Sequence, residues 1–146
     1  MNNEVRLYTD GSFQCKNGIP SVTYAFLVFK GDSVVYKEGS YLDKNIFARY
    51  YKQRNVFGEI MAVLEGVFHC IREGYKNITI CHDYQGVACW INGEWRAKNE
   101  LTQFYVQQFN ELSKDDVTIK FVHVKAHTGD RFNEMVDELA NSYHQF

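Results

Sequence analysis

Apolar and polar positions in the first third of the chain predict three β-strands, at residues 5–13, 22–29 and 34–41. Residues 22–29 are almost continuously apolar, which is typical of a strand buried on both faces. The short polar segment 31–33 then predicts a hairpin turn between the second and third strands. Strands joined by such short turns are expected to run antiparallel.

From residue 59 onward the apolar positions change to a helical spacing. Residues 59–73 predict a helix whose apolar stripe consists of Ile60, Val63, Leu64, Val67, Cys70 and Ile71. Gly74 follows as a stop signal. The rest of the chain predicts strands at 77–82 and 117–124, helices at 84–91, 101–112 and 131–143, and a loop at 92–99.

The predicted element order is βββαβααβα. Strands that follow a helical connection are expected to lie parallel to the first strand. We therefore expect an α/β fold: a mixed five-stranded sheet, with three antiparallel strands followed by two parallel ones and helices on both faces. A length of 146 residues fits one domain spanning residues 1–146.

Composition favours a soluble globular protein, since 45% of residues are apolar and 23% are charged. The N-terminal residues lack a signal-peptide core, and no apolar run approaches membrane-spanning length, so we expect a cytoplasmic protein without a membrane partner. Its cysteines form no CxxC pair, which favours reduced and mostly buried thiols over a zinc site or a disulfide. These cysteines are Cys15, Cys70, Cys81 and Cys89.

A net charge of −2 is not typical of a simple nucleic-acid-binding protein, but the charge is unevenly distributed. Residues 44–58 contain no acidic residue, and basic and aromatic side chains alternate there: Lys44, Phe47, Arg49, Tyr50, Tyr51, Lys52, Arg54 and Phe57. One interpretation is a solvated connection with a few core aromatics. The segment ends directly before Glu59, a candidate metal ligand, and this position favours contact with nucleic acid instead.

Four carboxylates are the main candidates for chemistry: Asp10, Glu59, Asp83 and Asp137. Each has a structural explanation when taken alone: a turn aspartate before Gly11, a carboxylate at a helix N-terminus, a helix cap and a solvated helix edge, respectively. Together they are better explained by a shared site, because two of them follow strands expected to be parallel.

Clustered carboxylates repel one another unless a cation neutralises them. Oxygen ligands select Mg²⁺ or Mn²⁺, and two such ions about 4 Å apart would promote in-line displacement at a phosphodiester. His127 lies in a Thr-Gly-Asp loop ten residues before Asp137 and is a candidate for proton transfer or product release. His123, within a predicted strand, is expected to be structural.

These motifs together resemble type 1 ribonuclease H from end to end of the chain. The resemblance rests on Tyr8-Thr9-Asp10-Gly11-Ser12, on Gly58-Glu59-Ile60-Met61-Ala62 and on His82-Asp83-Tyr84-Gln85. It continues through Val124-Lys125-Ala126-His127-Thr128-Gly129 and Asn133-Glu134 to Asp137-Glu138-Leu139-Ala140. No single motif is decisive, but their presence in this order is specific.

The resemblance implies an endoribonuclease that cleaves the RNA strand of RNA–DNA hybrids and leaves 5′-phosphate and 3′-hydroxyl ends. It implies two Mg²⁺ ions, for which Mn²⁺ can substitute, held by Asp10, Glu59, Asp83 and Asp137, with His127 assisting turnover. We expect a monomer. The residues expected to contact nucleic acid are Gly11, Ser12, Arg54, Asn55, Trp95 and Asn133.

The chain departs from the family pattern at three places. Residues 13–18 form a different turn after Ser12, and Arg54 replaces a small polar residue and would bind a DNA phosphate by charge. Residues 93–99 shorten a basic protrusion, and Trp95 there either stacks on the DNA strand or packs under the loop. Three alternatives remain: a detached reverse-transcriptase domain, a catalytically silent hybrid-binding module, and a nuclease of this fold that cuts DNA.

Overall fold

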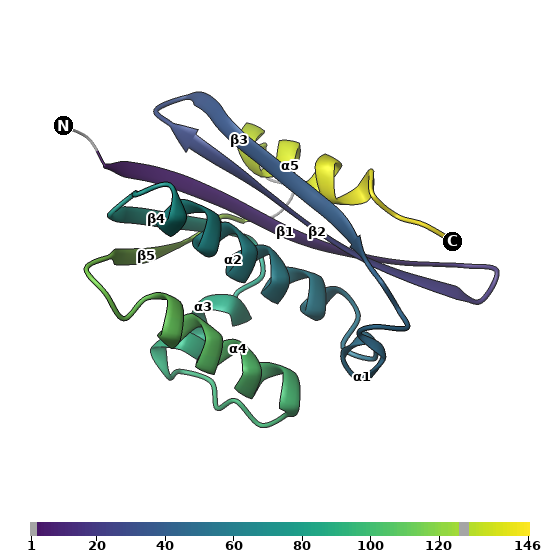
Figure 1. Ribbon diagram of the computed structural model, residues 1–146. Helices are drawn as coiled ribbons and strands as arrows, with labels where there is room; N and C mark the ends of the chain where they lie inside the picture. The colour runs from purple at the N-terminus through teal and green to yellow at the C-terminus, as the bar shows by residue number, and fades with distance from the viewer. Residues whose placement is uncertain (1–2, 126–128) are drawn as a thin grey trace.

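The centre of the molecule is a five-stranded sheet (Figure 1), seen in a computed structural model that describes residues 3–125 and 129–146. Its strands are β1 (Glu4–Lys16), β2 (Ile19–Lys30), β3 (Ser33–Leu42), β4 (Asn77–His82) and β5 (Thr118–His123). They lie in the order β3-β2-β1-β4-β5. β1 pairs antiparallel with β2, as β2 does with β3, whereas β4 is parallel to β1 and β5 to β4. The predicted mixed sheet is confirmed.

Helices cover both faces of the sheet, as predicted. They are α1 (Ala48–Tyr51), α2 (Asn55–Arg72), α3 (Gly86–Asn92), α4 (Glu100–Leu112) and α5 (Arg131–Asn141). α2 crosses one face with α4 packed beside it, and α5 lies on the opposite face (Figure 1). Each face therefore has its own hydrophobic cluster, the larger one beneath α2 and the smaller one beneath α5.

β2 lies between these two clusters and is buried on both sides. Phe26 and Val28 face the cluster of α2, whereas Leu27 and Phe29 face that of α5. This arrangement explains why residues 22–29 are apolar without alternation, since both faces of the strand exclude water. The prediction of a doubly buried strand is confirmed.

The hairpin between β1 and β2 differs from the prediction. β1 continues to Lys16, and only Asn17 and Gly18 form the turn, with φ of 52° and 78°. An Asn-Gly pair adopts these positive φ values at low cost, which suits a two-residue hairpin. The prediction that residues 13–18 form a turn was therefore wrong, because residues 13–16 pair with β2 in regular register.

α2 begins four residues earlier than predicted, and the short helix α1 was not predicted. Arg54 stands at the N-cap of α2 with φ of 54° and makes no capping bond from its side chain. Glu59 consequently lies in the second turn, where the helix dipole explains less of its presence. The predicted stop is confirmed, since Gly74 has φ of 90° and its N–H donates to the Ile71 carbonyl at 3.0 Å. β2 begins three residues before its predicted start, and the remaining predicted boundaries differ by up to two residues.

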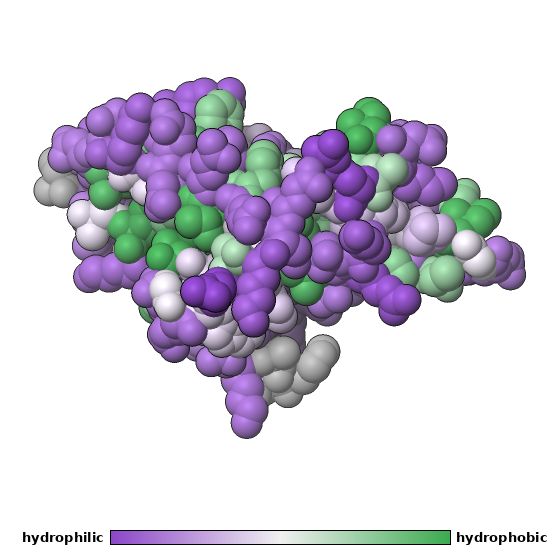
Figure 2. Space-filling model, turned by 90° about the horizontal axis from the view of Figure 1, so that it is seen from below, coloured by the Kyte–Doolittle hydropathy of each residue, from purple (hydrophilic) through white to green (hydrophobic). Residues whose placement is uncertain are grey.

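All four cysteines are free, and Cys70, Cys81 and Cys89 are buried whereas Cys15 is exposed, so the prediction of mostly buried thiols is confirmed. The face seen in Figure 2 is mostly hydrophilic, with smaller hydrophobic patches between polar residues. Over the described residues, no helix combines the length and the apolar character that crossing a bilayer requires.

Candidate active site

Two of the four candidate carboxylates are placed by the pairing of β1 with β4. Thr9 and His82 are the last partners in this parallel pair. Asp10 and Asp83 are the next residues of their respective segments, so both leave the paired region at the same edge of the sheet. β1 continues along β2 beyond this point, whereas β4 ends at His82. The end of β4 therefore brings the two carboxylates together, as the parallel arrangement predicted.

The third carboxylate reaches the site through direct backbone contact between α2 and the sheet. A Cβ atom on Gly11 would overlap the Glu59 nitrogen, and one on Gly58 would overlap the Thr23 carbonyl oxygen. A Cβ atom on Gly58 would also lie only 3.0 Å from the Gly11 Cα. Only glycines permit such an approach, and it places Glu59 beside Asp10. Gly58 was quoted only as part of the motif around Glu59, and its backbone contact with β1 and β2 was not predicted.

Asp10, Glu59 and Asp83 form one cluster. Each offers a carboxylate oxygen, and these oxygens lie within 4.8 Å of one another. Asp10 is 3% and Glu59 is 4% exposed, whereas Asp83 is half-buried. The Gly11 N–H donates to Asp10 Oδ1 at 3.0 Å, but Asp10 Oδ2 is buried without a hydrogen-bond partner in the described structure. A buried oxygen of this kind, aimed among other carboxylates, fits a cation ligand.

The electrostatics of the cluster lead to the same conclusion. Burial, followed by the charges of Asp83 and Asp137, raises the pKa of Asp10 from 3.8 to about 9. Burial, followed by the charge of Asp10 and then that of Asp83, raises the pKa of Glu59 well above its ordinary value. The ionised cluster is therefore destabilising by itself, and a bound cation would relieve both burial and repulsion.

Asp137 approaches this cluster from α5. Its carboxyl is among the causes that raise the pKa of Asp10, yet it is not one of the three residues whose oxygens mutually approach within 4.8 Å. α5 is fixed at its start by Asp130, whose Oδ1 accepts from the Phe132 and Asn133 N–H groups at 3.0 Å each. The structure thus brings all four carboxylates to one place, with Asp137 at the side.

The expected nucleic-acid contacts lie in different environments. Ser12 is already engaged, since its hydroxyl donates to Asn141 Oδ1 at 2.7 Å and lies 2.8 Å from His144 Nε2. Asn133 is buried, and its Oδ1 lacks a partner in the described structure. Arg54 and Asn55 are exposed at the start of α2, with the Arg54 guanidinium 5.2 Å from the centre of the Phe13 ring. His127 lies outside the described residues.

Trp95 packs in the loop and remains partly accessible. Its ring lies edge-on to Trp90 at 5.5 Å and to Tyr84 at 6.4 Å, while 40% of the residue is exposed. Packing under the loop therefore accounts for part of the ring. Contact with a DNA strand stays a prediction for the exposed part.

The basic segment 44–58 contains both core aromatic residues and exposed basic side chains. Tyr51 and Phe57 are core residues, whereas Lys52 and Arg54 are exposed. Arg49 is also exposed, but it forms an ion pair with Glu100 at 2.6 Å. Lys52 and Arg54 are thus the basic groups of this helical region for which we predict phosphate contacts.

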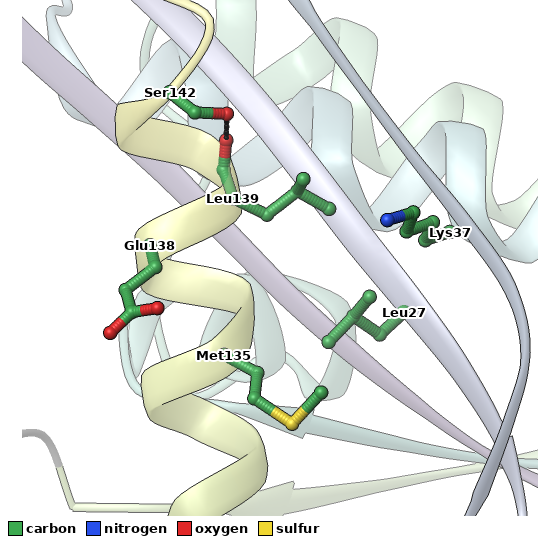
Figure 3. A pocket seen from close by; sticks show the side chains of 6 residues that line it. All are labelled: Leu27, Lys37, Met135, Glu138, Leu139 and Ser142. Carbon is green, nitrogen blue, oxygen red and sulfur yellow. Dashed lines mark hydrogen bonds between the residues drawn. The ribbon is translucent and has the colours of Figure 1, made fainter.

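A separate groove of about 320 Å³ lies between α5 and the β2–β3 hairpin. Figure 3 shows Leu27, Met135 and Leu139 beside it, with Lys37 across from α5. Ser142 closes one end, where its hydroxyl donates to the Leu139 carbonyl at 2.6 Å. None of the candidate site residues that the structure describes lines this groove, so it is distinct from the carboxylate cluster.

Comparisons with known proteins agree with this geometry. The family described as RNase H matches residues 2–145. A ribonuclease HI of Neisseria meningitidis serogroup B is 30% identical over 156 residues, which cover 97% of this chain and 95% of that protein.

Two solved structures share the fold. RNase H1 of the halophilic archaeon Halobacterium salinarum is 21% identical with a TM-score of 0.76, covering 95% of this chain and 96% of that one. LC11-RNase H1, solved in complex with an RNA/DNA hybrid, is 14% identical with a TM-score of 0.72, covering 94% and 97%. With a family match over almost its whole length, this chain belongs to the RNase H family, whose ribonuclease H members are hydrolases that act on RNA–DNA hybrids.

Proposed function

We propose that this protein is an endoribonuclease that cleaves the RNA strand of RNA–DNA hybrids by metal-dependent hydrolysis, leaving 5′-phosphate and 3′-hydroxyl ends. The observation that carries the proposal is the cluster of Asp10, Glu59 and Asp83, whose oxygens lie within 4.8 Å of one another in a chain of the RNase H family. Residues 1–146 would act as a single catalytic domain, and we expect a cytoplasmic monomer.

The metal ions would be held by Asp10, Glu59, Asp83 and Asp137. All donors in this set are carboxylate oxygens, which suit Mg²⁺ and also Mn²⁺. Two Mg²⁺ ions, when bound, would activate a water and stabilise the leaving 3′ oxygen. The unpartnered Oδ2 of Asp10 and the raised pKa values of Asp10 and Glu59 support this assignment, because both features describe carboxylates arranged for a cation.

The residues around the cluster would select and orient the duplex. Arg54 and Asn55 are exposed on the segment that leads into Glu59, close to the carboxylates in the fold. A guanidinium there would hold a phosphate, and an amide would contact base or sugar edges in the minor groove. The 2′-hydroxyl distinguishes the RNA strand from DNA, and recognition by backbone shape implies little sequence preference.

Ser12 and Asn133 would contribute differently from Arg54. The Ser12 hydroxyl is bonded within the protein, so the backbone of Gly11 and Ser12 would face the RNA. Asn133 would act from the buried flank of α5 that also carries Asp137. Placement of His127 in product release remains part of the proposal.

The test is cleavage of an end-labelled RNA–DNA hybrid in Mg²⁺, beside matched single-stranded RNA, duplex RNA and duplex DNA. We expect cutting of the hybrid's RNA strand alone. Binding of hybrid without cleavage would replace the proposal with a silent binding module, and cleavage of duplex DNA would indicate a nuclease of different specificity.

A further inference from the structure

Two histidines hold the turn that carries Asp83. His82 Nδ1 lies 3.0 Å from the Tyr84 carbonyl oxygen, and His123 Nε2 lies 3.1 Å from the Asp83 carbonyl oxygen. A carbonyl oxygen only accepts hydrogen bonds, so each ring carries its proton on the nitrogen that faces the turn. The two carbonyls that flank the Cα of Tyr84 are thus bonded by imidazole donors.

The rings themselves are fixed by the sheet. His82 and His123 are partners in the parallel pairing of β4 with β5, and their rings lie 5.7 Å apart at an interplanar angle of 30°. Phe121 packs edge-on against His82, also at 5.7 Å. The Val124 N–H donates to the His82 carbonyl at 2.7 Å, which extends the pairing to the end of β4. The donors are therefore attached to a rigid support.

The backbone of the turn needs such support. β4 ends at His82 and α3 begins at Gly86, so residues 83–85 lie in neither element. The orientation of a ligand carboxylate depends on its backbone as well as on its side chain, and small displacements at a metal site weaken binding. Both imidazole bonds act on this backbone, one of them on the carbonyl of Asp83 itself.

We propose that His82 and His123 are positioning residues that orient Asp83 for metal binding. This inference rests on the proposed metal-dependent cleavage. Neither ring is a member of the carboxylate cluster, and both act through the peptide groups of the turn. A purely structural role of the same rings would come from stacking, which can be separated from hydrogen-bond donation by substitution.

Two variants of the exposed residue His123 separate ring stacking from hydrogen-bond donation. His123→Gln keeps a donor near the position of Nε2 but removes the ring, whereas His123→Phe keeps the ring and removes the donor. We expect Phe to raise the Mg²⁺ concentration for half-maximal hybrid cleavage about tenfold. We expect the Mg²⁺ concentration for half-maximal cleavage by His123→Gln to stay within about twofold of that of the original protein, because the bond to the Asp83 carbonyl is retained.

A second readout does not depend on activity. Mg²⁺ stabilises a protein that binds it, so the rise in Tm on adding Mg²⁺ reports the integrity of the site. His123→Phe should show a smaller rise than His123→Gln, and His82→Asn, which keeps a donor near Nδ1, should show a larger rise than His82→Phe. His69→Phe is the matched control, since His69 stacks on Tyr36 at 3.7 Å, far along α2 from Glu59. That control should leave the Mg²⁺ response unchanged.

The reverse order, with the Phe variants normal and the Gln and Asn variants impaired, would overturn the inference in favour of ring stacking. Equal responses in all variants would overturn it as well. Failure of the original protein to cleave hybrid would instead refute the proposed function, while the Mg²⁺-dependent Tm would still compare the donors.

Discussion

Replacing Asp10 by Asn should make the metal-free protein more stable while abolishing hydrolysis. The Asn side chain keeps an oxygen that can accept from the Gly11 N–H, as Oδ1 does at 3.0 Å. Its NH₂ group takes the place of Oδ2, which is buried without a partner in the described structure. A neutral donor among carboxylates thus replaces a carboxyl group that both burial and repulsion oppose when ionised.

The magnitude follows from the pKa of Asp10, which the fold raises from 3.8 to about 9. Since the folded-state pKa is above the unfolded one, the folded state holds a proton that the unfolded state loses. The contribution of Asp10 to stability is therefore largest below pH 3.8 and declines as the pH rises toward 9. A pKa difference of one unit corresponds to about 1.4 kcal/mol. We therefore expect Asp10→Asn to raise the free energy of unfolding at pH 7 by about 2–4 kcal/mol.

The assay is urea or thermal unfolding in EDTA, at a series of pH values between 4 and 9. A gain of this size corresponds to a rise in Tm of roughly 5–12 °C for a domain of this length. The difference between Asp10→Asn and the original protein should grow with pH and nearly vanish at pH 4. Adding Mg²⁺ should narrow the gap, because the cation stabilises the original cluster more than the variant.

Two results would refute this reasoning. One is a variant that is less stable than the original protein at pH 8 without metal, which would mean that the carboxyl contributes more in contacts than its charge costs. The other is a gap that widens toward low pH, because that sign belongs to a carboxyl with a depressed pKa.

Three further predictions concern the surroundings of the cluster. Gly58→Ala should lower stability by about 2–3 kcal/mol, because its Cβ would overlap the Thr23 carbonyl; an unchanged urea midpoint would contradict the backbone contact. Arg54→Gln should raise KM for hybrid roughly fivefold, equivalent to about 1 kcal/mol, and leave kcat unchanged. The slope of log affinity against log salt concentration should fall by about one. A lowered kcat at unchanged KM would argue against phosphate binding. Burial lowers the pKa of His82 from 6.5 to about 4, so its ring should stay neutral in NMR titrations until about pH 4. The unfolded protein therefore binds this proton at a higher pH than the folded protein, and the free energy of unfolding should fall by about 3 kcal/mol between pH 6.5 and pH 4. His82→Asn should lack this part of the pH dependence of stability.

The sequence indicated the sheet because each strand carries a local signal. Residues 22–29 are apolar throughout, and the element order alone separates antiparallel from parallel neighbours. Asn17-Gly18 is also a local signal, and giving it more weight would have placed the hairpin turn correctly. The start of α2 had no such signal, since Arg54 adopts a positive φ without a capping side chain.

The site was predictable to the extent that it depends on strand order. Asp10 and Asp83 meet because their strands are parallel neighbours. The approach of Glu59 depends on a contact between glycines 47 positions apart in the sequence, Gly11 and Gly58, which local patterns do not show. The histidine bonds at the Asp83 turn were missed for another reason: their acceptors are backbone carbonyls, which every residue has.

The contact between Gly11 and Gly58 also bears on how this protein tolerates sequence change. The spacing of Asp10 and Glu59 is set where two main chains touch, with no side chain in between. Substitutions that alter the volume of the surrounding core can shift side-chain packing elsewhere without changing this backbone contact. The distance between the two carboxylates therefore depends little on substitutions that accumulate in the hydrophobic core. A single methyl group at either glycine, by contrast, would change this distance directly.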